Sequence, residues 1–154
     1  MTKRKKRIGI LTAGGDCPGL NAAIRGVGKT AIVEYGMEVI GFRSGYSGLI
    51  HNDYLELKES QLSGILTLGG TILGTSREKP FKNGGADAQD KPDTILQNYN
   101  DLGLDALVCI GGNGTMKTAP MLSQQGLNVV GIPRTIDKDV WGAAITFGFE
   151  SAVE

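Results

Sequence analysis

Short runs of mostly apolar residues alternate along the chain with longer segments in which apolar and polar residues mix. Each run has the length of a buried strand. Four of them predict such strands: residues 7–13, 38–42, 105–110 and 128–132. Residues 54–57 are more polar, and we expect a short edge strand there.

The mixed segments repeat their apolar residues at the spacing of one helix face. Residues 20–35 predict a helix that Gly36 is well suited to end. The apolar face of this helix comprises Leu20, Ala23, Ile24, Val27 and Ala31. Residues 92–102 predict a second helix, and residues 115–125 predict a third, which Pro120 is expected to kink or delay.

This alternation of strands and helices predicts a three-layer αβα fold of Rossmann-like type, with helices on both faces of a mostly parallel sheet. The first strand-helix-strand unit is expected to be right-handed. A short helix at residues 60–66 and a polar loop at residues 79–91 interrupt the pattern. The length suits one domain, which we expect at residues 7–154, after a basic, flexible tail at residues 1–6.

Composition narrows the class of partner. The formal net charge is zero, which favours neither a nucleic acid nor a membrane, and no apolar run approaches the roughly 20 residues of a membrane-spanning helix. Cys17 and Cys109 form no metal or disulfide pattern, and no signal peptide is evident, so we expect a cytoplasmic protein. The single histidine, His51, is expected in a turn and has no cluster of ligands around it.

Glycine is abundant, with 24 residues, and it gathers in two loops that each follow a predicted strand and precede a helix, at residues 14–19 and 111–114. Backbone amides at a helix start bind phosphate well where glycine lets it approach. Each loop alone is equally compatible with an ordinary turn, but two such loops together with a pair of aspartates favour a phosphate site.

The sequence Gly28-Lys29-Thr30 does not end a P-loop, because that motif requires glycine where Ala23 stands.

Polar side chains also gather where the run at residues 128–132 ends. Thr135, Asp137 and Asp139 follow it, at the place where open α/β sheets hold their ligands. Carboxylates two residues apart in extended backbone point to opposite sides, so we expect these two to have different roles. Arg77 follows a further apolar stretch and offers a planar cationic fork for phosphate, although an ordinary surface arginine is the alternative.

Four segments resemble the motifs of the phosphofructokinase family in the family's order and spacing: residues 10–25, 69–77, 110–115 and 133–139. The resemblance runs from residue 7 to residue 154 and matches the first, nucleotide-side half of the family's catalytic unit. It implies a magnesium-dependent glycolytic kinase that transfers a phosphoryl group from ATP, or in some branches from pyrophosphate, to the 1-hydroxyl of fructose 6-phosphate. It also implies an allosteric enzyme that is a homodimer or homotetramer at full length.

The same resemblance implies roles for individual residues. Asp137 would be the general base on the sugar hydroxyl, Thr135 would hydrogen-bond the sugar, and Asp139 would organise the metal and phosphate region. Arg77 would stabilise charge on the transferred group. The residues that would contact the nucleotide or its phosphates are Gly14, Gly15, Tyr46, Arg77, Gly112, Asn113, Gly114 and Thr115.

The chain departs from the family pattern at two positions. Asn113 stands where the family has a metal-binding aspartate, and a neutral amide oxygen is a weaker magnesium ligand than a carboxylate. Lys138 replaces the asparagine between the two acids. For the donor, Gly114 resembles ATP-using members and Arg134 resembles pyrophosphate-using members, and we favour ATP. The family's second half, which holds most of the sugar-phosphate site, is absent, so this chain alone is expected to be inactive.

Two other functions stay open. A nucleotide- or phosphate-binding module without catalysis, such as a degenerate or regulatory subunit, would explain Asn113 and Lys138. A NAD or lipid kinase of the related superfamily would explain the loop at residues 111–114 but neither residues 10–25 nor residues 74–77. Turnover of fructose 6-phosphate would exclude the non-catalytic module.

Overall fold

The computed structural model describes residues 4–14, 19–65, 70–76, 80–81, 91–135 and 147–148. Within them, one six-stranded sheet has the strand order β3-β2-β1-β4-β5-β6. All neighbouring strands are parallel except β3, which is antiparallel to β2. The strands are β1 (Arg7–Ala13), β2 (Glu38–Phe42), β3 (Tyr54–Leu57), β4 (Ala106–Gly111), β5 (Val129–Thr135) and β6 (Phe147–Gly148).

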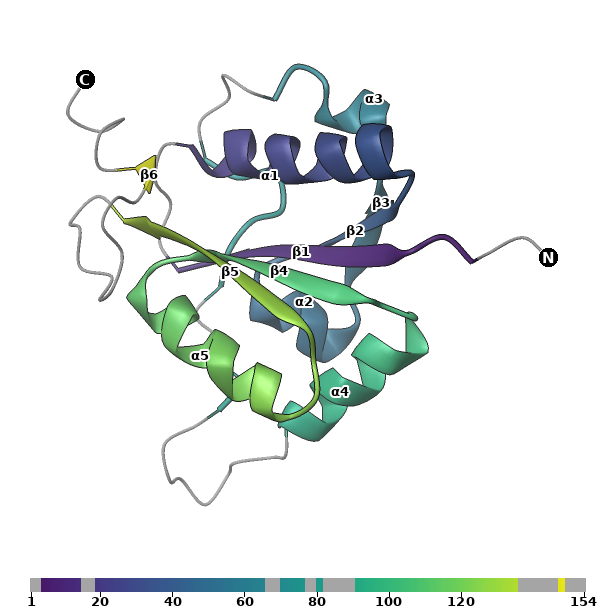
Figure 1. Ribbon diagram of the computed structural model, residues 1–154. Helices are drawn as coiled ribbons and strands as arrows, with labels where there is room; N and C mark the ends of the chain where they lie inside the picture. The colour runs from purple at the N-terminus through teal and green to yellow at the C-terminus, as the bar shows by residue number, and fades with distance from the viewer. Residues whose placement is uncertain are drawn as a thin grey trace.

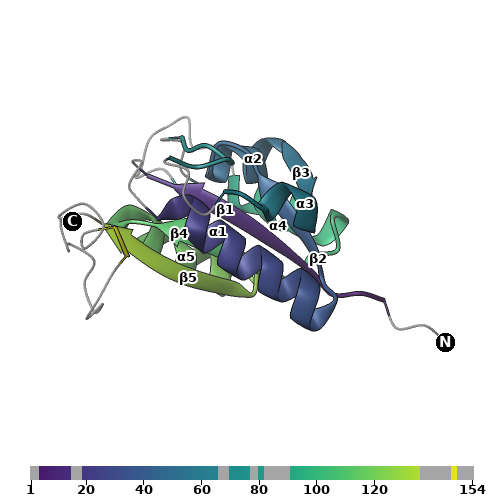
Figure 2. The ribbon, with the colours of Figure 1, turned by 90° about the horizontal axis from the view of Figure 1, so that it is seen from above.

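Helices cover both faces of this sheet, which confirms the three-layer αβα prediction (Figure 1). On one face lie α1 and α3, and on the other lie α2, α4 and α5 (Figure 1). Viewed from the α1 side, α1 runs along the strands, with α3 beside it (Figure 2). The helical elements are α1 (Leu20–Lys29), the π-helical turn η1 (Thr30–Glu34), α2 (Tyr46–His51), α3 (Glu59–Leu62), α4 (Lys91–Asp101) and α5 (Asn113–Gln124).

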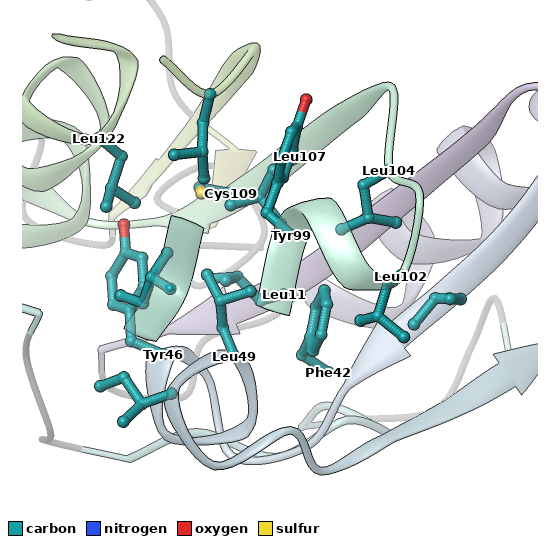
Figure 3. Close-up of a cluster of buried hydrophobic side chains, with 14 of the residues drawn as sticks. Leu11, Phe42, Tyr46, Leu49, Tyr99, Leu102, Leu104, Leu107, Cys109 and Leu122 are labelled. Carbon is teal, nitrogen blue, oxygen red and sulfur yellow. The ribbon is translucent and has the colours of Figure 1, made fainter. Parts of the chain in front are cut away.

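Two hydrophobic cores fill the space between the layers, because successive residues of a strand point to opposite faces. In β4, Val108 belongs to the core under α1 and Cys109 to the core under α5, and Ile10 and Leu11 divide in the same way in β1. We call these the α1-side core and the α5-side core. Figure 3 shows the α5-side core, in which the side chains of Tyr46 and Leu122 approach Cys109.

The helix predicted at residues 20–35 is confirmed, although its last turn is π-helical. Gly36, with φ of 62°, ends it, and the amides of Gly36 and Met37 bond back to the carbonyls of Ile32 and Ala31. The short helix expected at residues 60–66 is smaller than predicted. Ser63 is already extended after α3, and Gly64 has φ of 84°.

Two expectations about the other elements were wrong: Pro120 does not delay the third helix, and His51 does not lie in a turn. α5 begins at Asn113 and continues through Pro120 without a break. Because Pro120 has no amide hydrogen, the carbonyl of Met116 lacks its usual helical donor. α2 was not predicted from the sequence. His51 is the last residue of this helix, and the turn follows at Asn52. Most of the loop expected at residues 79–91 lies outside the described residues.

The amino-terminal edge of the sheet is held by ion pairs. The carboxylate of Asp105 accepts hydrogen bonds from the Arg4 guanidinium (2.9 Å) and from the Arg7 backbone amide (2.8 Å). The Arg7 side chain pairs with Glu38 and donates to the carbonyl of Leu102. Arg4, within the expected tail, is thus attached to the domain. No helix in the described part of the chain is long and apolar enough to cross a membrane.

Candidate phosphate-binding site

The candidate site lies at the carboxyl edge of the sheet, between β1 and β4. β1 leads into α1 on one face, whereas β4 leads into α5 on the other, so the connections diverge between these adjacent strands. The register places Ala13, Gly111 and Pro133 side by side at the ends of β1, β4 and β5. Ligands of open α/β sheets bind in the crevice at such a divergence. The strand ends that precede the two predicted glycine loops therefore lie side by side.

The first turn of α5 presents backbone amides at this edge. Gly112 is the N-cap residue, has extended backbone and makes no side-chain capping hydrogen bond. The first helical hydrogen bond runs from the amide of Met116 to the carbonyl of Gly112, 3.0 Å apart. The amides of residues 113–115 precede that bond and have no partner within the helix. Together with the helix dipole, they favour an anion at this position.

Gly111 lets α5 pack directly on the strand ends. A Cβ atom at this position would overlap the hydroxyl of Thr115 and would lie 2.7 Å from the carbonyl oxygen of Ala13. Gly114 has the opposite environment. It is exposed, and a Cβ atom there would meet none of the described residues within 4 Å. Among the described residues, the turn is therefore close-packed at Gly111 and uncovered at Gly114.

Tyr46 contacts the first turn of α5 from the α5-side core. Its side chain is 3% exposed and lies in the α5-side core, beside the buried thiol of Cys109 (Figure 3). Its hydroxyl donates to the carbonyl oxygen of Thr115, at 3.3 Å. Burial raises the pKa of Tyr46 far above its usual range and raises the pKa of Cys109 to about 12, so both groups stay protonated near neutral pH. The observed contact of Tyr46 is thus with the helix, and its contact with a nucleotide stays a prediction.

The segment at residues 70–76 lies beside the end of β1. The Thr12 hydroxyl donates to the carbonyl of Gly74, and the Ser44 amide donates to the carbonyl of Leu73. Gly14, which follows β1, is exposed and has φ of 87°. The structure thus brings together Gly14, the first turn of α5 and the segment that precedes Arg77 in the sequence. The sequence did not reveal Thr12 or Ser44 as parts of this arrangement.

Several predicted site residues lie outside the described residues: Gly15, Arg77, Asp137 and Asp139. Thr135 ends β5, and only its backbone is described. Within the described residues, His, Cys, Asp and Glu form no group of three that could hold a metal ion. Asn113, half-buried at the start of α5, could supply one neutral oxygen. Because Mg²⁺ is usually held by one or two carboxylates together with substrate phosphates, Asn113 fits as an auxiliary ligand only.

Comparisons with known proteins identify the family of this chain. A family model described as phosphofructokinase matches residues 7–154. The chain is 62% identical over 148 residues to ATP-dependent 6-phosphofructokinase 3 of Bacteroides thetaiotaomicron, covering 96% of this chain and 44% of that protein. It is 47% identical over 150 residues to the pyrophosphate–fructose 6-phosphate 1-phosphotransferase of Dictyoglomus thermophilum, covering 97% of this chain and 42% of that protein.

The fold also matches solved structures. The crystal structure of Pichia pastoris phosphofructokinase in the T-state superposes with a TM-score of 0.84 at 32% identity, covering 100% of this chain and 18% of that chain. The chain thus spans less than half the length of the curated relatives named above. The sequence match extends over all five strands from β1 to β5 and over both glycine loops. The chain therefore belongs to the phosphofructokinase family.

Proposed function

We propose that the chain is the phosphoryl-donor half of an ATP-dependent 6-phosphofructokinase. The observation that carries this proposal is the first turn of α5, which lies at the divergence of β1 and β4. Its first amides have no partner within the helix, and Gly114 is exposed. Such a turn suits the phosphates of a nucleotide. The relative from Bacteroides thetaiotaomicron, which is named as ATP-dependent, supports the choice of donor.

In this proposal the backbone binds and the side chains perform the chemistry. Amides of Gly14, Gly15 and residues 112–115 would hold the donor phosphates, as helix N-termini and glycine loops do. Arg77 would stabilise the negative charge of the group in transfer. Electrostatic stabilisation and positioning supply most of the catalysis in phosphoryl transfer, so fixed amides and a cation suit this reaction.

The acceptor side of the proposal rests on the segment that follows β5. Thr135 would hydrogen-bond the sugar, and Asp137 would align the 1-hydroxyl of fructose 6-phosphate and accept its proton. Asp139 would act on the metal and phosphate side, where Mg²⁺ would neutralise phosphate charge. Asn113 would add one oxygen to that region. The enzyme is expected to be a homo-oligomer, as the resemblance implies.

A pyrophosphate-dependent enzyme is the second candidate. The relative from Dictyoglomus thermophilum carries that activity in its name, and Arg134 resembles the residue typical of pyrophosphate users. The two donors differ in bulk beyond the transferred phosphates, because only ATP carries a nucleoside. None of the described residues lies within 4 Å of a Cβ atom at Gly114, and this room for extra bulk favours ATP.

The test is the rate at which the enzyme containing this chain converts fructose 6-phosphate, with either ATP or pyrophosphate and magnesium. We expect kcat/KM to be at least about tenfold higher with ATP, which corresponds to about 1.4 kcal/mol of transition-state stabilisation. A preference for pyrophosphate would select the second candidate. No turnover with either donor, together with measurable ATP binding, would support the non-catalytic module instead.

A further inference from the structure

Three segments meet at the end of β1: the strand itself, the turn after β2 and the segment at residues 71–74. The turn contains Ser44 and Gly45 with φ of 58° and 63°. The amide of Ser44 donates to the carbonyl of Leu73 at 2.8 Å. A Cβ atom on Gly45 would lie 2.9 Å from the carbonyl oxygen of Thr12. The backbones at this junction are therefore in close contact.

Thr12 lies at the centre of the junction and is 0% exposed. Its hydroxyl oxygen is 2.9 Å from both the hydroxyl oxygen of Thr71 and the carbonyl oxygen of Gly74. A carbonyl can only accept, so the single hydroxyl hydrogen of Thr12 goes to Gly74. Thr71 must then donate to Thr12. The Thr71 oxygen also accepts from the amide of Leu73, at 3.2 Å.

These contacts form one directed chain of hydrogen bonds. It runs from the amide of Leu73 through the hydroxyls of Thr71 and Thr12 to the carbonyl of Gly74. Hydrogen bonds in such chains polarise and strengthen one another. Removing the Thr12 hydroxyl would break two links at once and would leave the Gly74 carbonyl without its hydroxyl donor.

A second attachment holds the same segment to α1. The amide of Ile72 donates to the side-chain oxygen of Asn21 at 2.7 Å, and Asn21 is buried in the first turn of α1. β1 and α1 are the two elements that border the Gly14 loop. The segment is thus fixed to both sides of one proposed donor loop, and only the attachment to β1 depends on Thr12.

We propose that Thr12 is a positioning residue, which fixes the segment at residues 71–76 relative to the donor-phosphate loop at Gly14. This inference rests on the proposed function. Thr12 is fully buried, so it acts through the segment and does not touch a substrate. Arg77 follows Ser76 in the sequence. A shift of the segment would therefore also move Arg77, the residue proposed to stabilise the transferred group. Small displacements of such groups can lower rates by about a hundredfold.

The test compares Thr12→Val with Thr12→Ser in the enzyme that contains this chain. Valine keeps the volume and removes the hydroxyl, whereas serine keeps the hydroxyl. For Thr12→Val we expect kcat to fall about tenfold or more while KM for ATP stays within about twofold, because the amides of Gly14 and α5 still bind the donor. For Thr12→Ser we expect kcat within about twofold of the parent enzyme.

Amide hydrogen exchange supplies a readout that does not depend on turnover. In Thr12→Val, exchange at Leu73 and Ser44 should become about tenfold faster, because the bonds across the junction are weakened. Exchange at Ile72, which is bonded to Asn21, and at Val108 in β4 should not change. Tyr99→Phe is the matched control for a lost core hydroxyl, because the hydrogen bond that the Tyr99 hydroxyl accepts from the amide of Asn128 is long, at 3.4 Å.

Three results would overturn the proposal: an unchanged kcat in Thr12→Val, an equal fall in Thr12→Ser, or faster exchange spread evenly over the sheet. Thr71→Val also breaks two links of the chain, those to Leu73 and to Thr12, and should lower kcat in the same direction if Thr12→Val does not fold. Failure of the proposed function is distinguishable. The parent enzyme would then lack turnover, while exchange at Leu73 and Ser44 would still decide whether Thr12 holds the segment.

Discussion

Gly114 offers the sharpest test of where the donor phosphates bind. We expect Gly114→Asp to raise KM for ATP while leaving the fold intact. A Cβ atom at this position meets none of the described residues within 4 Å, so the new side chain has no clash with them at its Cβ. Its carboxylate would extend from the first turn of α5, on the side where the phosphates are proposed to lie.

The size of the effect follows from charge repulsion. Two unit charges about 4 Å apart repel by about 1 kcal/mol in bulk water and by about 4 kcal/mol at an effective dielectric constant of about 20. KM for ATP should therefore rise between about fivefold and about a thousandfold. The fold should not suffer, because an acidic residue in the first turn of a helix stabilises it by about 0.3–1 kcal/mol.

Two matched variants separate charge from bulk. Gly114→Asn has nearly the shape of the aspartate without its charge, and Gly114→Ala adds a single methyl group. We expect KM for ATP to stay within about threefold for both, measured by steady-state kinetics, with unfolding by urea as the check on stability. Equal increases for asparagine and aspartate would show that bulk is responsible. An unchanged KM in Gly114→Asp would refute the placement of the phosphates at α5.

Three further predictions concern the metal, the packing of α5 and the amino-terminal edge. Asn113→Asp should raise activity most at low magnesium, since a carboxylate binds Mg²⁺ better than an amide, and equal gains across a magnesium titration would contradict this. Gly111→Ala should lower the free energy of unfolding by about 1–3 kcal/mol, measured with urea, because its methyl group would overlap Thr115. Hydrogen bonding by the Arg7 amide, with help from Arg4, holds the pKa of Asp105 below its usual value. The stability that this carboxylate adds should be present above about pH 4 and lost as the pH falls through its folded pKa, so the difference between the parent and Asp105→Asn should shrink in acid.

The strands and the long helices could be predicted from the sequence because their signals are local. The apolar run of β1 and the apolar face of α1 each lie within one short segment. The start of α5 could not be placed, because it depends on Gly111 fitting between Thr115 and the end of β1, which is a tertiary contact. β5 continues beyond residue 132, where the predicted strand ended, to Thr135. Pro133 pairs with Gly111 in the sheet, although proline has no amide hydrogen to donate.

The site was only partly predictable. Both glycine loops were located from the sequence, and the alternation of strands and helices predicted a mostly parallel sheet. The alternation did not predict the strand order, which places β1 beside β4. The buried position of Tyr46 was not foreseen, because α2 is a short helix that contains glycine and carries no clear helical period. The hydroxyl chain of Thr12 and Thr71 joins residues 59 positions apart, so no local pattern could reveal it.

The division of the interior into two cores has a consequence for how this protein can change. The Gly14 loop leads into α1 and the loop at Gly112 leads into α5, so the two halves of the proposed donor site rest on different cores. A substitution at Val108 would act on the support of the first loop, and a substitution at Cys109 on that of the second. Substitutions at neighbouring positions of one strand could therefore change the position of one phosphate loop and leave the other loop unchanged.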